Sequence, residues 1–141
     1  MRVYGECENG AEILIRDSDL NLNNPNNRYK WRVVRVGSGS YKIESVECGS
    51  AYVLSPSYNK CEDGRKIMLK PWESRSAQIW GDGCNNCDWV EFNIKGTCDK
   101  EISVRGDSST VYDEDQRLEL QESNPNWGVS SRWSILLSLR S

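Results

Sequence analysis

The sequence predicts an all-β fold, a barrel built from three pseudo-repeats of about 50 residues each. Short apolar segments alternate with turn-forming residues throughout the 141 residues, and no segment keeps a helical hydrophobic period over about ten residues. Tyrosines recur every 54 residues, at Tyr4, Tyr58 and Tyr112, and tryptophans recur at a similar period, at Trp31, Trp80 and Trp133. One unit this short cannot bury its own apolar face, whereas three units packed around an axis can.

Each of the three tyrosines opens the same local motif. A turn of the type Glu-Asn-Gly or Glu-Asp-Gly follows the first two tyrosines and leads into a short apolar strand, which is typical of a β-hairpin. The motif covers residues 4–15, 58–69 and 112–120, and the third copy is three residues shorter and lacks the cysteine of the others.

The remaining elements follow from alternation and from turn residues. Strands are expected at residues 13–15, 29–36, 41–46, 51–54, 67–70, 77–80, 89–94, 101–104, 118–121 and 132–136. Polar or Gly-rich stretches separate them, with Asn- and Pro-rich loops at 17–28 and 123–128, a turn at 37–40, a hairpin loop at 55–64, a loop at 71–76 and a turn region at 81–88.

The repeats can be aligned with one another. The segment 41–43 corresponds to 92–94, and 51–54 corresponds to 101–104. We therefore expect a single domain over residues 1–141, with repeat 1 at about 1–36, repeat 2 at about 37–84 and repeat 3 at about 85–141. The first repeat supplies only its second half and is expected to be incomplete.

Composition excludes several classes of function. The net charge of −3 and the pI near 5.1 give no basic footprint for nucleic acid. The mean hydropathy is −0.71, and no apolar run approaches the ~20 residues that a membrane span needs. The chain has no histidine, and therefore lacks the usual general base and the commonest metal ligand. We expect no enzyme activity, no cofactor and no metal.

The six cysteines predict an oxidising compartment. They are Cys7, Cys48, Cys61, Cys84, Cys87 and Cys98, and all are disulfide candidates. Because no signal peptide follows Met1, a secreted protein would be the mature product; a cytosolic protein with reduced thiols is the alternative. The pair Cys84 and Cys87 could form a redox pair, half of a zinc site or a structural disulfide, or each could bond elsewhere. Without a second CxxC, a structural role is favoured, and six cysteines allow 15 pairings.

This pattern resembles the β-trefoil, most closely the ricin-type (QxW) lectin domain. The second repeat has Gly64, the strand 67–69 and a complete Gln78-Ile79-Trp80 motif, and the third keeps Trp133 without the glutamine. The segments 19–22 and 31–33 also resemble the Kunitz-type (soybean) trypsin inhibitors, another trefoil family.

The lectin resemblance implies a sugar site at the hairpin between the second and third strands of a repeat. Its parts are an Asp ending the second strand, an aromatic ring and a polar side chain. The third repeat would supply Asp107, Tyr112 and Asp115 or Gln116; the second would supply Tyr58 and Asp63, with Ser55 where an Asp is expected; the first offers only Tyr4 and Asn9. The resemblance also favours a Cys48–Cys61 disulfide. The alternative is that the tyrosines recur because they pack at the barrel end.

Two further features are candidates for binding. Trp72, and Trp127 with Asn124 and Asn126, stand in equivalent loops and could be exposed aromatics that bind a carbohydrate or peptide, or could pack over the barrel end. Arg105-Gly106-Asp107 on a predicted hairpin tip could engage an adhesion receptor.

Together these features predict a non-enzymatic extracellular binding module that recognises carbohydrate through hairpin and loop aromatics. A Kunitz-like protease inhibitor that acts through a rigid loop, at 19–27 or 123–128, is the alternative, and an adhesive or structural extracellular protein is a third. The expected partner is a glycan or an extracellular protein, with no nucleic acid and no membrane span.

Overall fold

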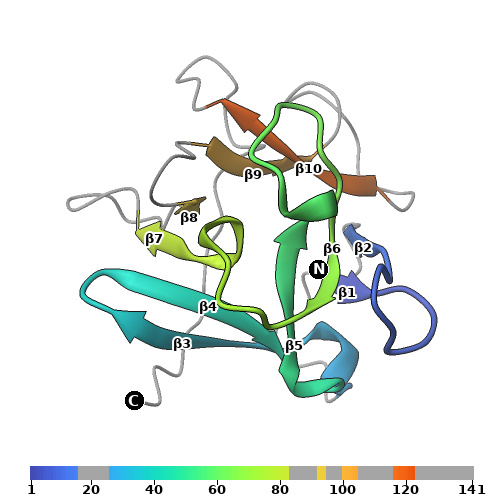
Figure 1. Ribbon diagram of the computed structural model, residues 1–141. Coiled ribbons are helices and arrows are strands. Elements are labelled where there is room, and N and C mark those ends of the chain that lie inside the picture. Colours follow the sequence, from blue (N-terminus) through green and yellow to red (C-terminus); the bar gives the residue numbers. More distant parts are fainter. Residues whose placement is uncertain (16–25, 83–91, 95–99, 105–115, 123–141) are drawn as a thin grey trace.

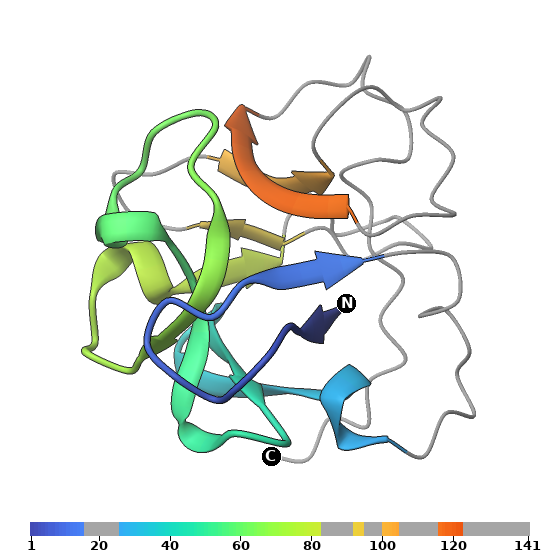
Figure 2. The same cartoon turned by 90° about the vertical axis from the view of Figure 1, so that its right-hand side faces the viewer.

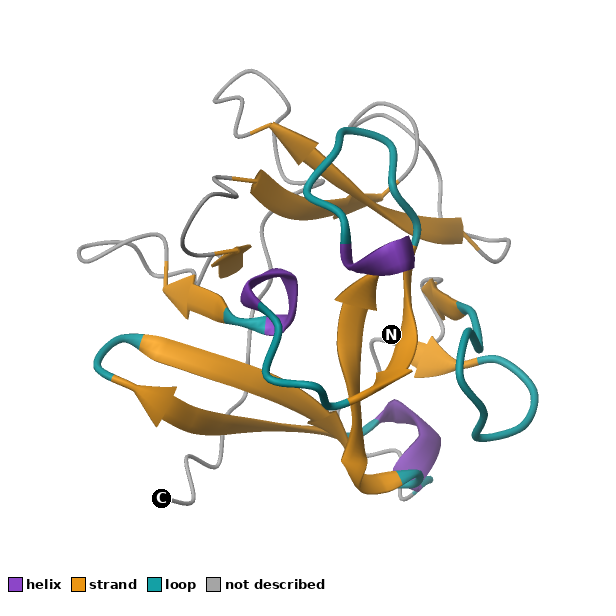
Figure 3. Ribbon diagram, viewed as in Figure 1, coloured by secondary structure: helices purple, strands orange, loops and turns teal. Residues whose placement is uncertain are grey.

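The computed structural model describes residues 1–15, 26–82, 92–94, 100–104 and 116–122. Over these residues the fold is all-β, as predicted (Figures 1 and 3). The strands are β1 (Arg2–Val3), β2 (Ile13–Ile15), β3 (Trp31–Gly37), β4 (Ser40–Ser45), β5 (Gly49–Pro56), β6 (Ile67–Pro71), β7 (Trp80–Asp82), β8 (Phe92–Ile94), β9 (Lys100–Val104) and β10 (Gln116–Glu122). Three short 3-10 helices are η2 (Asn27–Tyr29), η3 (Ser57–Asn59) and η4 (Ser76–Gln78).

The strands form one continuous antiparallel sheet in the described part of the chain. Its order is β1-β2-β10-β9-β8-β7-β4-β5-β6, and β3 pairs with β4. Strands far apart in sequence therefore lie side by side: β10 runs beside β2, and β7 pairs with both β4 and β8 (Figure 2).

Three hairpins carry the equivalent strands β2, β6 and β10. The hairpins are closed by the residue pairs Val3–Ile13, Pro56–Ile67 and Val104–Leu118. The second member of each pair is an aliphatic residue that is buried in the core, which is why the apolar strand recurs in the sequence.

The three hairpins meet in a cyclic junction. Ala11 of the first hairpin accepts a backbone hydrogen bond of 2.8 Å from Leu69 of the second. Arg65 of the second accepts one of 2.8 Å from Leu120 of the third, and Gln116 of the third pairs with Ile15 of the first.

The glycines of the first two hairpin turns complete these contacts. Gly10 donates to the carbonyl of Leu69, and Gly64 to that of Leu120, both at 2.8 Å. Both glycines have a positive φ, which a residue without Cβ adopts at no steric cost. Each hairpin therefore rests on the next repeat, and the described residues have threefold pseudo-symmetry.

The Gln-x-Trp motif has a structural role. Trp80 is fully buried, and its indole nitrogen donates to the carbonyl of Leu54 at 3.3 Å. Gln78 is also fully buried, donates to Pro71 at 2.8 Å and accepts from the amide of Glu73 at 2.9 Å. The Gln78 side chain thus makes the hydrogen bonds to the preceding loop that the backbone of a neighbouring strand would otherwise make.

This role of Gln78 corrects one predicted strand. Residues 77–80 were expected to be extended, but Ala77 and Gln78 belong to η4, and β7 begins only at Trp80. β7 then continues through Gly81 and Asp82, where a turn was predicted. Most other predicted strands are confirmed within a few residues of their bounds; residues 89–91 and 132–136 lie outside the described part.

The strand register also corrects the alignment of the repeats. Leu69 and Leu120 are equivalent in the junction, so the residues that follow them, Lys70 and Gln121, are equivalent too. Their strand partners, Val53 and Glu101, are therefore equivalent as well. Val53 pairs with Glu44, and Glu101 pairs with Asn93.

Ile43 therefore matches Phe92, whereas the sequence alignment had matched it to Ile94. The alignment of 51–54 with 101–104 is wrong by the same two residues, because Val53 matches Glu101 and not Ser103. A slip of two residues leaves every side chain on the same face, so the apolar pattern alone does not detect it.

Candidate binding groove at the second hairpin

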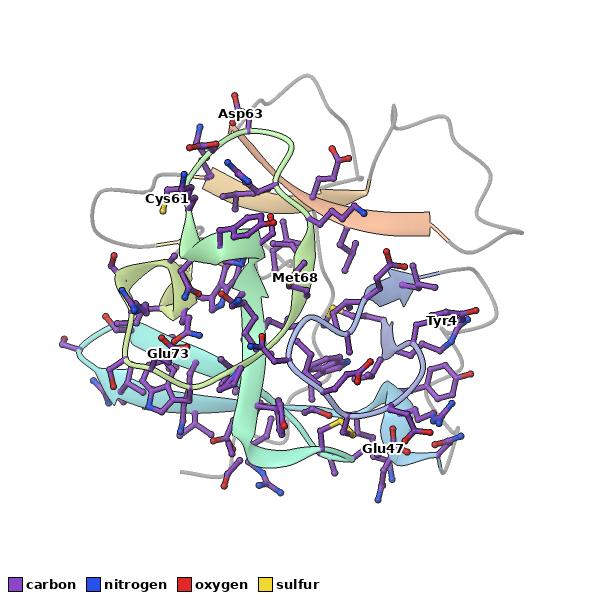
Figure 4. All side chains as sticks on the ribbon, turned by 45° about the vertical axis from the view of Figure 1, so that its right-hand side comes forward. Tyr4, Glu47, Cys61, Asp63, Met68 and Glu73 are labelled. Carbon is purple, nitrogen blue, oxygen red and sulfur yellow. A yellow bond between two sulfur atoms is a disulfide. The ribbon has the colours of Figure 1, made fainter. Side chains whose placement is uncertain are left out.

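The hairpin between β5 and β6 forms an open groove of about 480 Å³. A volume of this size falls in the range of small-ligand sites. Its lining comes from a single segment of the chain: Ser57, Tyr58, Glu62, Asp63, Gly64, Arg65, Lys66 and Met68. Figure 4 shows Cys61 and Asp63 on the loop above Met68, with Tyr4 on a separate hairpin.

The backbone at the entry of this loop is left-handed. Tyr58 has φ 57° and ψ 16°, and Asn59 has φ 52°. Asparagine tolerates this conformation, whereas for tyrosine it is uncommon and costs about 1–2 kcal/mol. Ser55, fully buried, donates its hydroxyl to the Asn59 side-chain oxygen at 2.7 Å and so fixes the turn.

Tyr58 is presented to solvent by this turn. The residue is 76% exposed, although it carries a large aromatic ring. The guanidinium of Arg65 lies 5.6 Å from the centroid of its ring, within cation–π range. Packing in the barrel therefore does not explain why a tyrosine stands at this position.

Arg65 is itself held by Glu62. Its Nε donates to Glu62 Oε2 at 3.0 Å, and its Nη2 contacts the same oxygen. This hydrogen bond holds the pKa of the Glu62 carboxyl below its usual value.

Asp63 connects the tip of the loop to the third repeat. Its carboxylate accepts a hydrogen bond from Lys100 Nζ at 2.7 Å, at the start of β9. Both Glu62 and Asp63 remain about half exposed, so each carboxylate keeps acceptor capacity for a ligand hydroxyl group.

The first hairpin presents an exposed tyrosine on a different backbone. Tyr4 is 57% exposed, so the interpretation that these tyrosines recur for packing is wrong for Tyr4 as well. The hairpin is closed by a hydrogen bond from the Tyr4 amide to Glu12, whereas the second is closed from Ser57 to Lys66.

The second hairpin is consequently one residue longer. In the first, one left-handed residue, Gly5, stands where the second has both Tyr58 and Asn59. The 54-residue spacing of the tyrosines therefore does not make Tyr4 and Tyr58 equivalent in the backbone.

Trp72, predicted as a binding aromatic, lies away from the groove. It follows the end of β6, is half-buried, and packs under Lys42, whose Nζ lies 5.1 Å from the ring centroid. Lys42 also pairs with the buried carboxylate of Glu44 at 2.9 Å. The structure therefore gives Trp72 a packing contact and does not bring it together with Tyr58.

The other predicted binding residues fall mostly outside the described part of the chain. These are Asp107, Tyr112, Asp115, Asn124, Asn126 and Trp127, as well as the Arg105-Gly106-Asp107 motif, the candidate inhibitory loop 123–128 and residues 19–25 of the other candidate loop. Gln116 is the first residue of β10, and its backbone pairs with Ile15.

The disulfide pattern differs from the predicted one. Cys7 is bonded to Cys48, so the expected Cys48–Cys61 bond is wrong. Cys61 is disulfide-bonded as well, to a partner outside the described residues, where Cys84, Cys87 and Cys98 also lie. The prediction paired cysteines within one repeat, whereas the Cys7–Cys48 bond joins the first hairpin to the turn between β4 and β5.

The carboxylate of Glu47 lies close to this disulfide. Because both sulfurs are in the bond, neither Cys7 nor Cys48 offers a thiolate to a metal ion. Glu47 instead pairs with Arg28 at 3.3 Å.

Sequence reasoning found Tyr58 and Asp63 but missed Glu62 and Arg65. Glu62 and Arg65 stand inside the motif 58–69, but only the positions that match the family arrangement were singled out. Arg65 is replaced by Ala11 in the first repeat, and that difference was the available signal. Among the described residues, no helix has the length and apolar character needed to cross a membrane.

Comparisons with known proteins concern the fold. No protein-family model and no curated protein matches the chain. A designed 3-fold symmetric protein, ThreeFoil, superposes with a TM-score of 0.78 and 16% identity, over 95% of this chain and 87% of that one. An exo-β-1,3-galactanase from Clostridium thermocellum superposes with a TM-score of 0.67 and 19% identity, over 96% of this chain and 29% of that one.

The chain therefore has an all-β, trefoil-like fold, which confirms the predicted fold class. The finer ricin-type and Kunitz-type resemblances stay predictions.

Proposed function

We propose that the chain is a non-enzymatic carbohydrate-binding module that acts in an extracellular, oxidising compartment. The observation that carries this proposal is Tyr58, an exposed aromatic ring on a strained backbone at the edge of a groove. Backbone strain of this kind clusters at binding sites, where the surrounding structure maintains it.

The chemistry of the groove supports a sugar ligand. The outer face of an aromatic ring packs on the C–H face of a pyranose, while Glu62 and Asp63 accept hydrogen bonds from its hydroxyl groups. A similar structure belongs to a galactanase, an enzyme whose name denotes a carbohydrate substrate, which favours the same class of ligand. The third hairpin, with Asp107, Tyr112, Asp115 and Gln116, is proposed as a second site on sequence grounds alone.

A glycan array tests the proposal. Tyr58→Ala should weaken binding to the recognised glycan by about tenfold or more, since one stacked ring contributes roughly 1.4 kcal/mol or more. Tyr4→Ala is the matched control, because it removes an exposed tyrosine from the neighbouring hairpin. Tyr112→Ala and Trp127→Ala measure the sites predicted from sequence.

The competing function is a protease inhibitor. If the array gives no signal, and protease inhibition is found and then lost on altering residues 19–27 or 123–128, the lectin proposal is wrong. Incubating the recognised glycan with the protein and finding it intact is the expected result for a module without enzyme activity.

Thiol counting under denaturing conditions tests the compartment. We expect at most two free thiols, because Cys7, Cys48 and Cys61 are all bonded and Cys61 has a further cysteine as its partner. Six free thiols in protein purified from its source would contradict secretion.

A further inference from the structure

Arg65 is the residue that links the exposed ring of Tyr58 to the rest of the fold. Its guanidinium lies over the ring on one side and is hydrogen-bonded to Glu62 on the other. We propose that Arg65 is a positioning residue, which holds the Tyr58 ring as a one-sided stacking platform for the ligand. This inference rests on the proposed binding function of the groove.

An exposed tyrosine needs such a support. Because the residue is 76% exposed, Tyr58 has few neighbours that limit its rotamers. If the ring becomes ordered only on binding, the lost side-chain entropy weakens the affinity for the ligand. A ring that is already ordered in the free protein avoids this cost.

Arg65 is itself well anchored. Its backbone carbonyl accepts the amide of Leu120 at 2.8 Å, and its amide donates to the carbonyl of Glu62 at 3.3 Å. The neighbouring Gly64 donates to Leu120 at 2.8 Å. The residue below the ring is therefore a member of the cyclic junction, and its position is set by the adjacent repeat.

The backbone of Tyr58 is fixed from the opposite side of the loop. The Ser55 hydroxyl binds the side chain of Asn59, and this contact holds the left-handed turn that contains Tyr58. The turn fixes the backbone from which the Tyr58 side chain extends, and Arg65 fixes the position of the ring.

The two described hairpins differ at both positions together. The first has one residue fewer at the turn and Ala11 in place of Arg65, so the equivalent position offers no guanidinium there. The supporting arginine therefore occurs in the same hairpin as the strained tyrosine.

This geometry also sets the direction of stacking. Because the guanidinium occupies one face of Tyr58, a ligand can stack only on the opposite face. A cation on the inner face draws on the electron density of the ring, so the gain from Arg65 comes from order and not from a stronger stack.

Three variants of the full chain test the inference. Arg65→Ala removes the support, and Arg65→Lys restores a cation on a flexible stem. Arg75→Ala is the control, because Arg75 forms a similar local pair with Glu73 at 3.2 Å on a different loop. Melting temperatures check that all three remain folded.

The first readout is NMR of the free protein with labelled tyrosine and arginine. In wild type, the side-chain protons of Arg65 should be shifted upfield by the Tyr58 ring, and this shift should vanish in Tyr58→Ala. In Arg65→Ala the Tyr58 ring signals should move toward those of an unstructured tyrosine, with no such change in Arg75→Ala.

The second readout is the Kd for the glycan identified on the array. We expect about tenfold weaker binding for Arg65→Ala, recovery to within about threefold for Arg65→Lys, and no change for Arg75→Ala. Unchanged Tyr58 signals in Arg65→Ala would overturn the inference, and so would an unchanged Kd.

The two proposals fail in different ways. If wild type binds no glycan, the binding function is wrong, and the NMR of the free protein still decides whether Arg65 orders Tyr58. If wild type binds glycan and Arg65→Ala binds equally well, only the positioning role is wrong.

Discussion

The first and second hairpins begin from equivalent strand pairs and end in equivalent glycines. Val3 pairs with Ile13 in one and Pro56 with Ile67 in the other, and Gly10 and Gly64 each donate to the following repeat. Between these fixed points the loops diverge, because the second is one residue longer and bears an arginine where the first has Ala11.

This comparison separates the scaffold from the groove. The positions that the repeats share, the buried strand residue and the glycine, maintain the junction. The positions at which they differ, Tyr58 with its added residue and Arg65, build the groove. The two hairpins also differ in their covalent attachments, since Cys7 of the first is bonded to Cys48.

The largest expected effect comes from removing that bond. The double variant Cys7→Ser, Cys48→Ser should lose about 4 kcal/mol of unfolding free energy, since the bond closes a loop with a sequence separation of 41. Urea unfolding measures the loss.

The groove of the second hairpin does not include either cysteine, so glycan binding by the folded double variant should persist. If binding disappears while the variant is still folded, the two hairpins are not independent.

The two glycines test the shared scaffold. Gly10→Ala and Gly64→Ala should each lower the free energy of unfolding by about 1–2 kcal/mol, because φ is 92° at Gly10 and 79° at Gly64. A Cβ added at either position meets no neighbouring atom, so the cost comes from the backbone conformation alone. Unfolding of both variants in urea should give similar losses. A loss in only one of them would show that the junction is not equivalent in the two repeats.

Tyr58→Gly tests the difference between the loops. The left-handed backbone is strained for tyrosine and free for glycine, so stability should rise by about 1 kcal/mol, or the melting temperature by about 3 °C, while glycan binding is lost. Tyr4→Gly should give no gain, since the positive φ at that turn belongs to Gly5. Equal effects in both variants would remove the distinction between the hairpins.

The smallest effect concerns the pair of Glu62 and Arg65. The pKa of Glu62 is lowered in the folded state, so the contribution of the pair is present above the usual pKa of the carboxyl and is lost as the pH falls through the lowered value. Because Glu62 is exposed, we expect a small change in stability and a clear change in the Arg65 side-chain NMR signals. Arg65 signals that do not titrate with the Glu62 carboxyl would argue against the pairing.

The repeat pattern was enough to predict the all-β fold and most of the strands. It succeeded because burial recurs with the symmetry, as at Ile13, Ile67 and Leu118. It failed where side chains replace backbone pairing, as at Gln78, and where a two-residue slip leaves the pattern intact, as at Ile43.

The candidate groove was predicted only in part. Tyr58 and Asp63 match a family arrangement and were found, whereas Arg65 and the added residue in the loop break the repeat. Periodicity does not show a residue that is present in one copy alone. The Cys7–Cys48 bond was missed because its partners lie in different repeats.

The cyclic junction has a consequence for how the chain folds. Its closing contact joins Ile15 to Gln116, so β2, which pairs with β1 along one edge, has its other edge paired only once β10 has formed. Contacts this distant in sequence form slowly, because the loop entropy is lost before the contact contributes. During synthesis the edge of β2 would stay open until most of the described chain had left the ribosome, and a chaperone that shields strand edges would have its longest opportunity there.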